Sequence, residues 1–153
     1  MRALSFTRTI GAGAFGTVYL ADFSSGQGFR RQVAVKVLNG DRPQSQMFLS
    51  RIRDEARLLG LLQDDAILKV LDMVRVHGRD AVVMEYVEGP NIKTIIESKG
   101  PVPCPRAIAL MIELAEALDH AFSNGITHRD IKPSIILVTL EGRAKLTDLG
   151  LAK

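Results

Sequence analysis

Two short motifs near the end of the sequence, joined by an apolar stretch, constrain the fold of this chain most strongly. The first motif is HRDIKP at residues 128–133, and the second is DLG at residues 148–150. Between them, residues 135–146 read IILVTLEGRAKL, which predicts a pair of short strands around a turn. An Asp-x-Gly tripeptide alone is an ordinary turn, so its value comes from standing 18 residues after Asp130.

A glycine-rich segment lies near the other end of the sequence. Gly11, Gly13 and Gly16 belong to GAGAFGTV at residues 11–18, and glycine lets a backbone turn closely over a phosphate because it has no Cβ. Residues 17–21 continue as a strand, which favours a hairpin over the strand-to-helix turn of dinucleotide-binding folds. Taken alone, the segment also fits a glycine-rich hairpin without a ligand.

One lysine interrupts an otherwise apolar strand. Lys36 lies in VAVKVL at residues 33–38, where burial of an ammonium group is costly unless an anionic group receives it. Glu55 is the candidate partner, because a helix expected from about 43 to 63 places it on a face that is otherwise apolar. The alternative is a solvated Glu55, which is the usual environment of a lone glutamate on a helix.

The remaining patterns predict the organisation of the chain. Residues 6–38 read as three antiparallel strands, and 67–76 and 81–86 as two more strands with a turn at 77–80. The segment VEGP at 87–90 interrupts both helix and strand patterns, so we expect one domain at 1–86 and a second at 87–153. Asn91 is expected to cap a helix that ends near Lys99, and a longer helix is expected from Pro105 to about Asn124. Its predicted apolar face carries Ile108, Ile112, Ala115, Leu118 and Phe122.

Composition excludes several classes of function. The 153 residues, 46% of them hydrophobic and 24% charged, are typical of an ordinary globular protein. The net charge is +3, but the basic residues are spread along the chain, so no nucleic-acid partner is expected. A single cysteine cannot form an internal disulfide, and we find neither a signal-peptide core nor an apolar stretch that would span a membrane. These features predict a cytoplasmic chain without a membrane segment.

In their order along the chain, the glycine-rich segment, the lysine strand, HRDIKP and DLG resemble the catalytic core of protein kinases of the bacterial serine/threonine type. The resemblance implies an α+β fold, with a five-stranded antiparallel sheet and one helix in the first lobe and a mainly helical second lobe. It covers about 6–153, which corresponds to the first part of such a domain, so the second lobe is expected to be incomplete. We therefore expect exposed apolar surface on the helix at 105–124, and a need for a further segment or a partner to fold.

The resemblance also implies ATP, Mg²⁺ and a protein substrate that offers a serine or threonine hydroxyl. Asp130 would accept the proton of that hydroxyl, and Lys132 would neutralise charge on the transferred phosphate. Lys36, oriented by Glu55, would hold the α- and β-phosphates, and Asp148 would bind Mg²⁺. Further nucleotide-binding positions implied in the same way are Ile10, Gly11, Gly13, Gly16, Val18, Ala34, Met84, Glu85, Val87 and Leu137.

Two positions depart from the family pattern, Ile135 and Leu149. Leu149 replaces the usual phenylalanine at a packing position, which is a mild change. Ile135 stands five residues after Asp130, where the family has a metal-binding asparagine. An alkyl side chain cannot coordinate Mg²⁺. The expected function is ATP-dependent phosphorylation of serine or threonine in a protein, with the competence of this chain placed in question by Ile135 and by the incomplete second lobe. The alternative is a pseudokinase-like module that binds a nucleotide or a partner and transfers no phosphate.

Overall fold

The chain forms two compact units. The computed structural model describes residues 3–13, 16–24, 28–39, 62 and 64–147, so the helix expected at 43–63 lies outside the described residues. The first unit comprises Met1–Ala56 and Lys69–Tyr86, and the second comprises Arg57–Leu68 and Val87–Lys153. Residues just before Lys69 join the second unit because the Leu68 amide donates to the Leu146 carbonyl at 2.9 Å, and the Leu146 amide to the Ala66 carbonyl at 2.7 Å. Residues 57–68 thus belong to the second unit, although they precede the boundary expected after residue 86.

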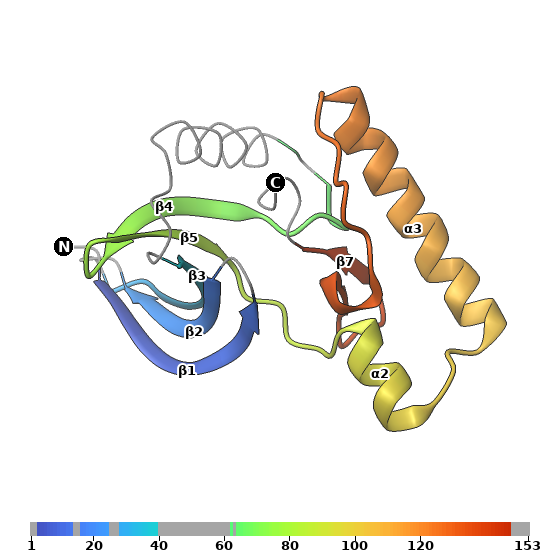
Figure 1. Cartoon of the computed structure of the whole chain (residues 1–153), viewed down its shortest axis with the longest axis horizontal. Coiled ribbons are helices and arrows are strands. Elements are labelled where there is room, and N and C mark those ends of the chain that lie inside the picture. Colours follow the sequence, from blue (N-terminus) through green and yellow to red (C-terminus); the bar gives the residue numbers. More distant parts are fainter. Residues whose placement is uncertain (1–2, 14–15, 25–27, 40–61, 63, 148–153) are drawn as a thin grey trace. The chain divides into compact units, whose positions relative to one another are not determined.

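Five strands form one antiparallel sheet in the first unit (Figure 1). They are β1 (Ala3–Gly13), β2 (Gly16–Ser24), β3 (Arg30–Leu38), β4 (Val70–Val76) and β5 (Arg79–Glu85). Their order across the sheet is β1-β2-β3-β5-β4. The structure thus confirms the expected three strands followed by a further pair, and the expected five-stranded antiparallel sheet.

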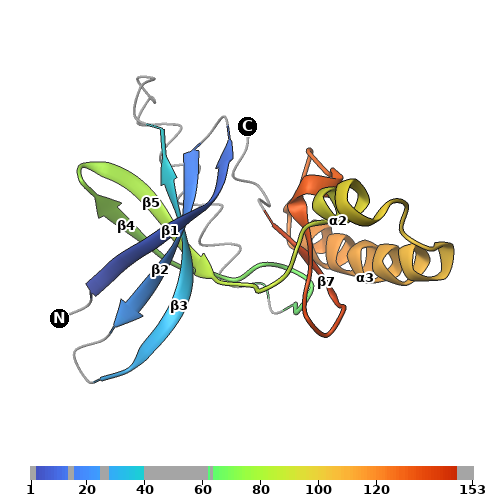
Figure 2. The ribbon, with the colours of Figure 1, turned by 90° about the horizontal axis from the view of Figure 1, so that it is seen from below.

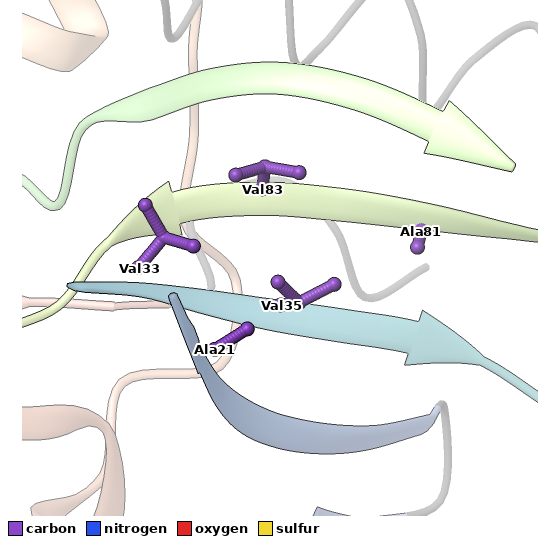
Figure 3. Packing of buried hydrophobic residues seen from close by; sticks show 5 residues of the cluster. All are labelled: Ala21, Val33, Val35, Ala81 and Val83. Carbon is purple, nitrogen blue, oxygen red and sulfur yellow. The ribbon is translucent and has the colours of Figure 1, made fainter. Parts of the chain in front are cut away.

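The core of the first unit lies on one face of this sheet (Figure 3). Val33 and Val35 of β3 are fully buried there, because side chains two residues apart in a strand point to the same face. Ala21 of β2 is opposite Val33, and Val83 of β5 is opposite Val35. Ala34 and Lys36 therefore point to the other face, which carries the candidate site.

The hairpin between β4 and β5 is tighter than the sequence pattern predicts. We expected a four-residue turn at 77–80, but Val76 pairs with Arg79, so only His77 and Gly78 form the loop. Both have positive φ, 48° and 80°, which is the geometry of the two-residue turns that match strand twist. Arg79 and Asp80 consequently belong to β5, where Asp80 forms an ion pair with Arg75.

The second unit contains helices and a short hairpin (Figure 2). The Asn91 side chain caps α2 (Ile92–Lys99) as expected, accepting a hydrogen bond from the Thr94 amide at 2.8 Å. The other elements are α3 (Cys104–Ser123), the 3₁₀ turn η1 (Pro133–Ile135) and the antiparallel strands β6 (Ile136–Val138) and β7 (Ala144–Leu146). Among the helices that the structure describes, none has the length and apolarity needed to cross a membrane.

The helix α3 is apolar on two sides, and the structure buries one of them. The side chains that α3 buries are Leu110, Leu114, Ala117 and Ala121. Three members of the predicted face are instead exposed, with exposed fractions of 59% for Ile108, 55% for Ile112 and 69% for Phe122. Spacing alone cannot tell which of two apolar sides of a helix packs, so the sequence did not identify the buried side. The exposed apolar surface expected on this helix is nevertheless present.

Candidate functional site

The hairpin of β1 and β2 contains the three glycines of the candidate phosphate loop. Gly11 is paired with Val18, and Gly13 with Gly16, next to residues 14 and 15, which lie outside the described residues. A Cβ at Gly16 would lie 2.3 Å from the backbone oxygen of Val37, so the packing of β3 requires glycine there. A Cβ at Gly13 would meet no atom within 4 Å, and one at Gly11 would make only an ordinary contact with Val18. The fold itself therefore does not explain glycine at positions 11 and 13.

Lys36 is buried on the face of the sheet opposite the core. Only 6% of the residue is exposed, and its neighbours across the sheet are Val18 of β2 and Val82 of β5. The burial agrees with the expectation drawn from the apolar strand. Glu55, the expected partner, lies outside the described residues.

Two other predicted nucleotide-binding residues lie in the row next to Lys36. Ala34 is paired with Leu20 of β2 and with Met84 of β5, and all three are buried. Because 34 and 36 are two residues apart in β3, this row and the Lys36 row share one face. Ile10 is 36% exposed, at an irregularity between Thr9 and Gly11 in the pairing of β1 with β2.

The predicted residues at the end of β5 belong to different units. Glu85 ends β5 in the first unit, where its carboxylate accepts a hydrogen bond from the Lys69 amide at 2.7 Å. Its own amide donates to the Lys69 carbonyl at 3.0 Å, so this N–H is used within the first unit. Val87 is half-buried and begins the second part of the second unit.

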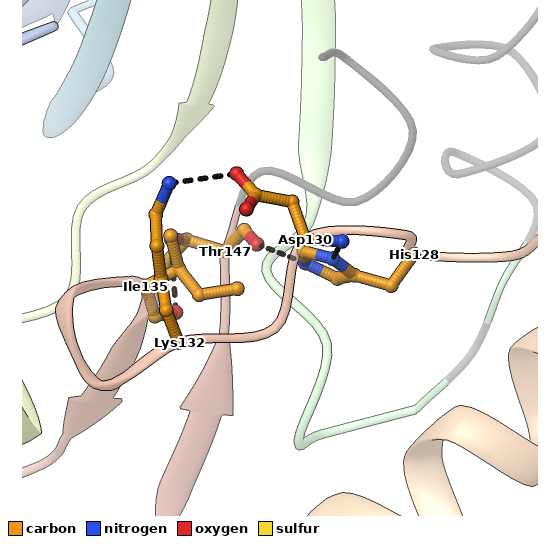
Figure 4. Close-up of polar contacts among 5 residues, drawn as sticks. All are labelled: His128, Asp130, Lys132, Ile135 and Thr147. Atoms are coloured by element: carbon orange, nitrogen blue, oxygen red, sulfur yellow. Dashed lines mark hydrogen bonds and ion pairs between the residues drawn. The ribbon is translucent and has the colours of Figure 1, made fainter. Parts of the chain in front are cut away.

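His128 organises the loop that carries Asp130 (Figure 4). The residue is 6% exposed, its ring Nε2 lies 3.0 Å from the Thr147 carbonyl oxygen, and its Nδ1 lies 3.2 Å from the Asp130 amide nitrogen. A carbonyl only accepts and an amide only donates, so Nε2 carries the proton and Nδ1 accepts. His128 thereby ties the backbone at Asp130 to the residue that follows β7.

Asp130 and Lys132 form a close ion pair in the same loop. The Lys132 Nζ lies 2.7 Å from the Asp130 Oδ2, and both side chains are partly exposed. Arg129, between His128 and Asp130, has a φ of 65°, a left-handed conformation that costs energy in a residue other than glycine. The loop therefore presents a carboxylate and an ammonium together, held by a strained backbone.

Ile135 closes this loop from the interior of the second unit. The residue is 5% exposed, and its amide donates to the Lys132 carbonyl at 3.1 Å. Its carbonyl accepts two hydrogen bonds from Thr147, from the amide at 2.9 Å and from the hydroxyl at 3.0 Å. Position 135 is thus a buried packing position that fixes the end of the loop.

No group of three or more histidine, cysteine, aspartate or glutamate side chains in the described part of the chain is arranged to hold an ion. Asp148, the expected Mg²⁺ ligand, lies outside that part, and the Ile135 side chain has no donor atom. Leu137, the remaining predicted nucleotide residue, lies half-buried in β6 and pairs with Lys145 of β7.

Sequence reasoning missed a carboxylate that links α3 to the hairpin of β6 and β7. Glu113 accepts a hydrogen bond from the Ala144 amide at 2.8 Å and pairs with Arg143 at 3.0 Å. Arg106, which is also in α3, donates a hydrogen bond to the Gly142 carbonyl. In the same turn, hydrogen bonds from the Glu141 backbone and the Thr139 side chain lower the pKa of the exposed Glu141. The only sequence signal for this role of Glu113 was that a charged residue stands on the packed side of an amphipathic helix.

Comparisons with known proteins agree with these arrangements. The family profile of the protein kinase domain matches residues 4–153. A probable serine/threonine-protein kinase of Clostridium perfringens is 40% identical over 144 residues, covering 94% of this chain and 21% of that protein. The serine/threonine-protein kinase PrkC of Bacillus subtilis is 37% identical over 145 residues, covering 95% of this chain and 22% of that protein. The crystal structure of the Mycobacterium tuberculosis PknI kinase domain has a TM-score of 0.84 and 29% identity, covering 100% of this chain and 61% of that chain.

Proposed function

The chain belongs to the protein kinase domain family, and from this we propose that it binds ATP and transfers the γ-phosphate to a serine or threonine hydroxyl of a protein. The bacterial relatives are serine/threonine-protein kinases by name. The chain spans less than a quarter of the length of these relatives, so the substrate and the activity of the whole protein are part of the proposal.

The observation that carries the proposal is the buried Lys36. Lys36 is 6% exposed and pairs with Val18 and Val82 in the sheet, and burial of a lysine is costly in free energy unless anionic groups accept the hydrogen bonds of its ammonium group. In protein kinases the lysine of this strand binds the α- and β-phosphates of ATP. The aliphatic row of Leu20, Ala34 and Met84 supplies the apolar surface that suits an adenine ring.

The glycines of the β1–β2 hairpin also support the proposal that the chain binds ATP. Gly11 and Gly13 have room for a Cβ in the fold, so their identity is better explained by a backbone that must approach a ligand closely. A triphosphate accepts hydrogen bonds from backbone amides in glycine-rich turns. We therefore assign Gly11 and Gly13 to phosphate binding and Gly16 to the packing of the hairpin.

The loop at 128–135 supplies the groups for the transfer step. The Asp130 carboxylate accepts the proton of the substrate hydroxyl, while the oxygen of that hydroxyl forms a bond to the γ-phosphorus. The bond from the γ-phosphorus to the oxygen bridging to the β-phosphate breaks, and ADP leaves with the negative charge on that oxygen. The Lys132 ammonium, 2.7 Å from Asp130, stabilises the charge on the transferred group. A bound divalent cation would neutralise phosphate charge.

A cytoplasmic location fits this activity, since ATP and protein substrates are available there. The single cysteine, Cys104, is exposed and free, which is typical of a reducing compartment. We therefore propose a cytoplasmic protein substrate and no nucleic-acid partner.

The alternative is a module that binds a nucleotide without transferring phosphate. Ile135 favours it, because the family uses an asparagine at this position to hold a metal ion during transfer. The two functions differ in one measurable step. A chain that binds ATP but incorporates no phosphate into any of a panel of protein substrates is the module.

Thermal unfolding with and without Mg²⁺ and ATP tests the nucleotide site. A ligand at about 100 times its Kd stabilises a protein by about 2.7 kcal/mol. At about 2 to 4 °C per kcal/mol, the expected rise in Tm is about 5 to 10 °C. Lys36→Met should abolish the rise, while Lys99→Met, at an exposed position of α2, should leave it intact. An unchanged Tm in the natural chain, or a rise retained in Lys36→Met, contradicts the proposal.

A further inference from the structure

The catalytic loop raises a question about metal ions that the family alone does not answer. Protein kinases hold two Mg²⁺ ions with ATP, and the asparagine of the catalytic loop is one of the ligands. In this chain the position belongs to Ile135, whose side chain has no oxygen or nitrogen. Mg²⁺ takes oxygen ligands almost without exception, so the side chain at 135 does not fit the ion.

The structure also shows that Ile135 is a stable part of the fold and not a side chain placed loosely at a ligand position. Its exposed fraction is 5%, similar to that of Ile136, at 4%. Both backbone groups of Ile135 are engaged, the amide with Lys132 and the carbonyl with Thr147. The side chain is thus held by burial and by the backbone at the same time.

The loop keeps its organisation without an amide side chain at position 135. The Thr147 amide and hydroxyl both bind the Ile135 carbonyl, and the Thr147 carbonyl accepts the hydrogen bond of His128. The His128 ring in turn accepts a hydrogen bond from the Asp130 amide, and the Asp130 carboxylate forms an ion pair with Lys132 (Figure 4). These contacts connect 128 to 135 through atoms of the chain alone, so a metal ion is not needed to bring the ends of the loop together.

We propose that position 135 contributes no metal site, so that this chain binds ATP without a second divalent cation coupled to it. The inference rests on the proposed nucleotide-binding function and adds how many divalent cations are coupled to ATP binding. In the two-metal arrangement, nucleotide affinity depends on magnesium twice, once through formation of MgATP and again through the second ion. Here only the first dependence is expected.

Isothermal titration of the full chain with ATP, at a series of free Mg²⁺ concentrations and constant ionic strength, tests this inference. Two coupled sites typically change each other's affinity by about 5- to 150-fold. Once all ATP is complexed, a further increase of about tenfold in free Mg²⁺ should change the Kd of the natural chain by less than about twofold, since no second site is coupled. A second increase in affinity, of about fivefold or more, would overturn the inference.

A matched pair of variants assigns the effect to position 135. Ile135→Asn should gain the second magnesium dependence, while Ile135→Val, which keeps an apolar side chain, should retain the profile of the natural chain. A folded Ile135→Asn chain with an unchanged profile would also overturn the inference. If Ile135→Asn does not fold, the profile of the natural chain alone decides. Absence of ATP binding at every magnesium concentration is a different result, because it overturns the proposed function itself.

Discussion

The sheet of the first unit and the loop of the second unit hold their candidate functional side chains by different means. Lys36 is placed by strand register, opposite Val18 and Val82, so its surroundings follow from a continuous ladder of backbone hydrogen bonds. The loop at 128–135 has no such ladder, and Asp130 is placed by single contacts with His128 and Lys132. We infer that the sheet tolerates side-chain changes that preserve volume, whereas the loop depends on each individual hydrogen bond. The departure from the family motif at the metal-ligand position, Ile135, lies in the loop.

The largest expected effect lies in the loop, and Asp130→Asn is the test. Loss of the proposed base should lower the rate of phosphate incorporation into a protein substrate by a factor of about 10² to 10⁴. The ATP-dependent rise in Tm should persist, because the Asp130–Lys132 pair is partly exposed and contributes about 0 to 1 kcal/mol to stability. Asp119→Asn, at an exposed position of α3, serves as the control. Equal rates for both variants would refute the assignment of Asp130.

The glycine hairpin provides the next test, because a change that adds volume to the sheet should be costly only where the backbone of another strand lies close. Gly16→Ala places a Cβ 2.3 Å from the Val37 backbone oxygen, so we expect a loss of about 3 kcal/mol in the free energy of unfolding. Gly13→Ala meets no atom and should change it by less than about 0.5 kcal/mol, while still weakening ATP binding. Urea denaturation and ATP titration of the two variants measure these effects. Equal destabilisation by both would contradict the separate roles of the two glycines.

Glu113 tests whether the hairpin beside the loop also depends on individual contacts. Glu113→Ala leaves the amide of the buried Ala144 without its acceptor, which should cost about 2 kcal/mol. Glu116→Ala, at an exposed position of the same helix, should change the unfolding free energy by less than about 0.5 kcal/mol. Urea denaturation compares them, and similar midpoints would show that the Glu113 contact does not hold the hairpin.

The smallest effect is expected at Thr147. Thr147→Val keeps the shape of the side chain but removes the hydroxyl that binds the Ile135 carbonyl, at a cost of about 1 kcal/mol. The amide hydrogen bond from the same residue persists, which limits the loss. Thr127→Val, at an exposed position, is the matched control in the same denaturation experiment. A stability equal to that of the natural chain would mean that the hydroxyl contact is not needed.

The strands of the first unit were predictable because β-branched and aromatic residues between turn residues mark each strand locally. The alternation of residues 33–36 separates the core side chains Val33 and Val35 from Ala34 and Lys36, and the structure places them on the two faces accordingly. Asn91 was similarly recognisable as a helix cap, since its contact with Thr94 is three residues away. Signals of this kind are local, and local sequence is sufficient to detect them.

The features that the sequence did not predict depend on distant residues. Glu113 binds Ala144, 31 positions later, and no periodicity links the two. The packed side of α3 was not identified, because both Leu110 and Ile112 belong to apolar stripes, and only the tertiary structure selects between them. His77 and Gly78 form a tighter turn than expected because the strand pairing continues to Arg79. Tertiary packing decided each of these cases.

The hydrogen bonds of His128 make its ring a natural spectroscopic reporter. A ring nitrogen that carries a proton and one that does not resonate at different ¹⁵N frequencies, and here the proton is assigned to Nε2 by the Thr147 carbonyl. The Nε2 proton, in a ring only 6% exposed, should exchange slowly enough with water to be observed directly. An NMR spectrum of the isotopically labelled chain can therefore follow the order of the 128–135 loop at a single nucleus, without any assay of phosphate transfer.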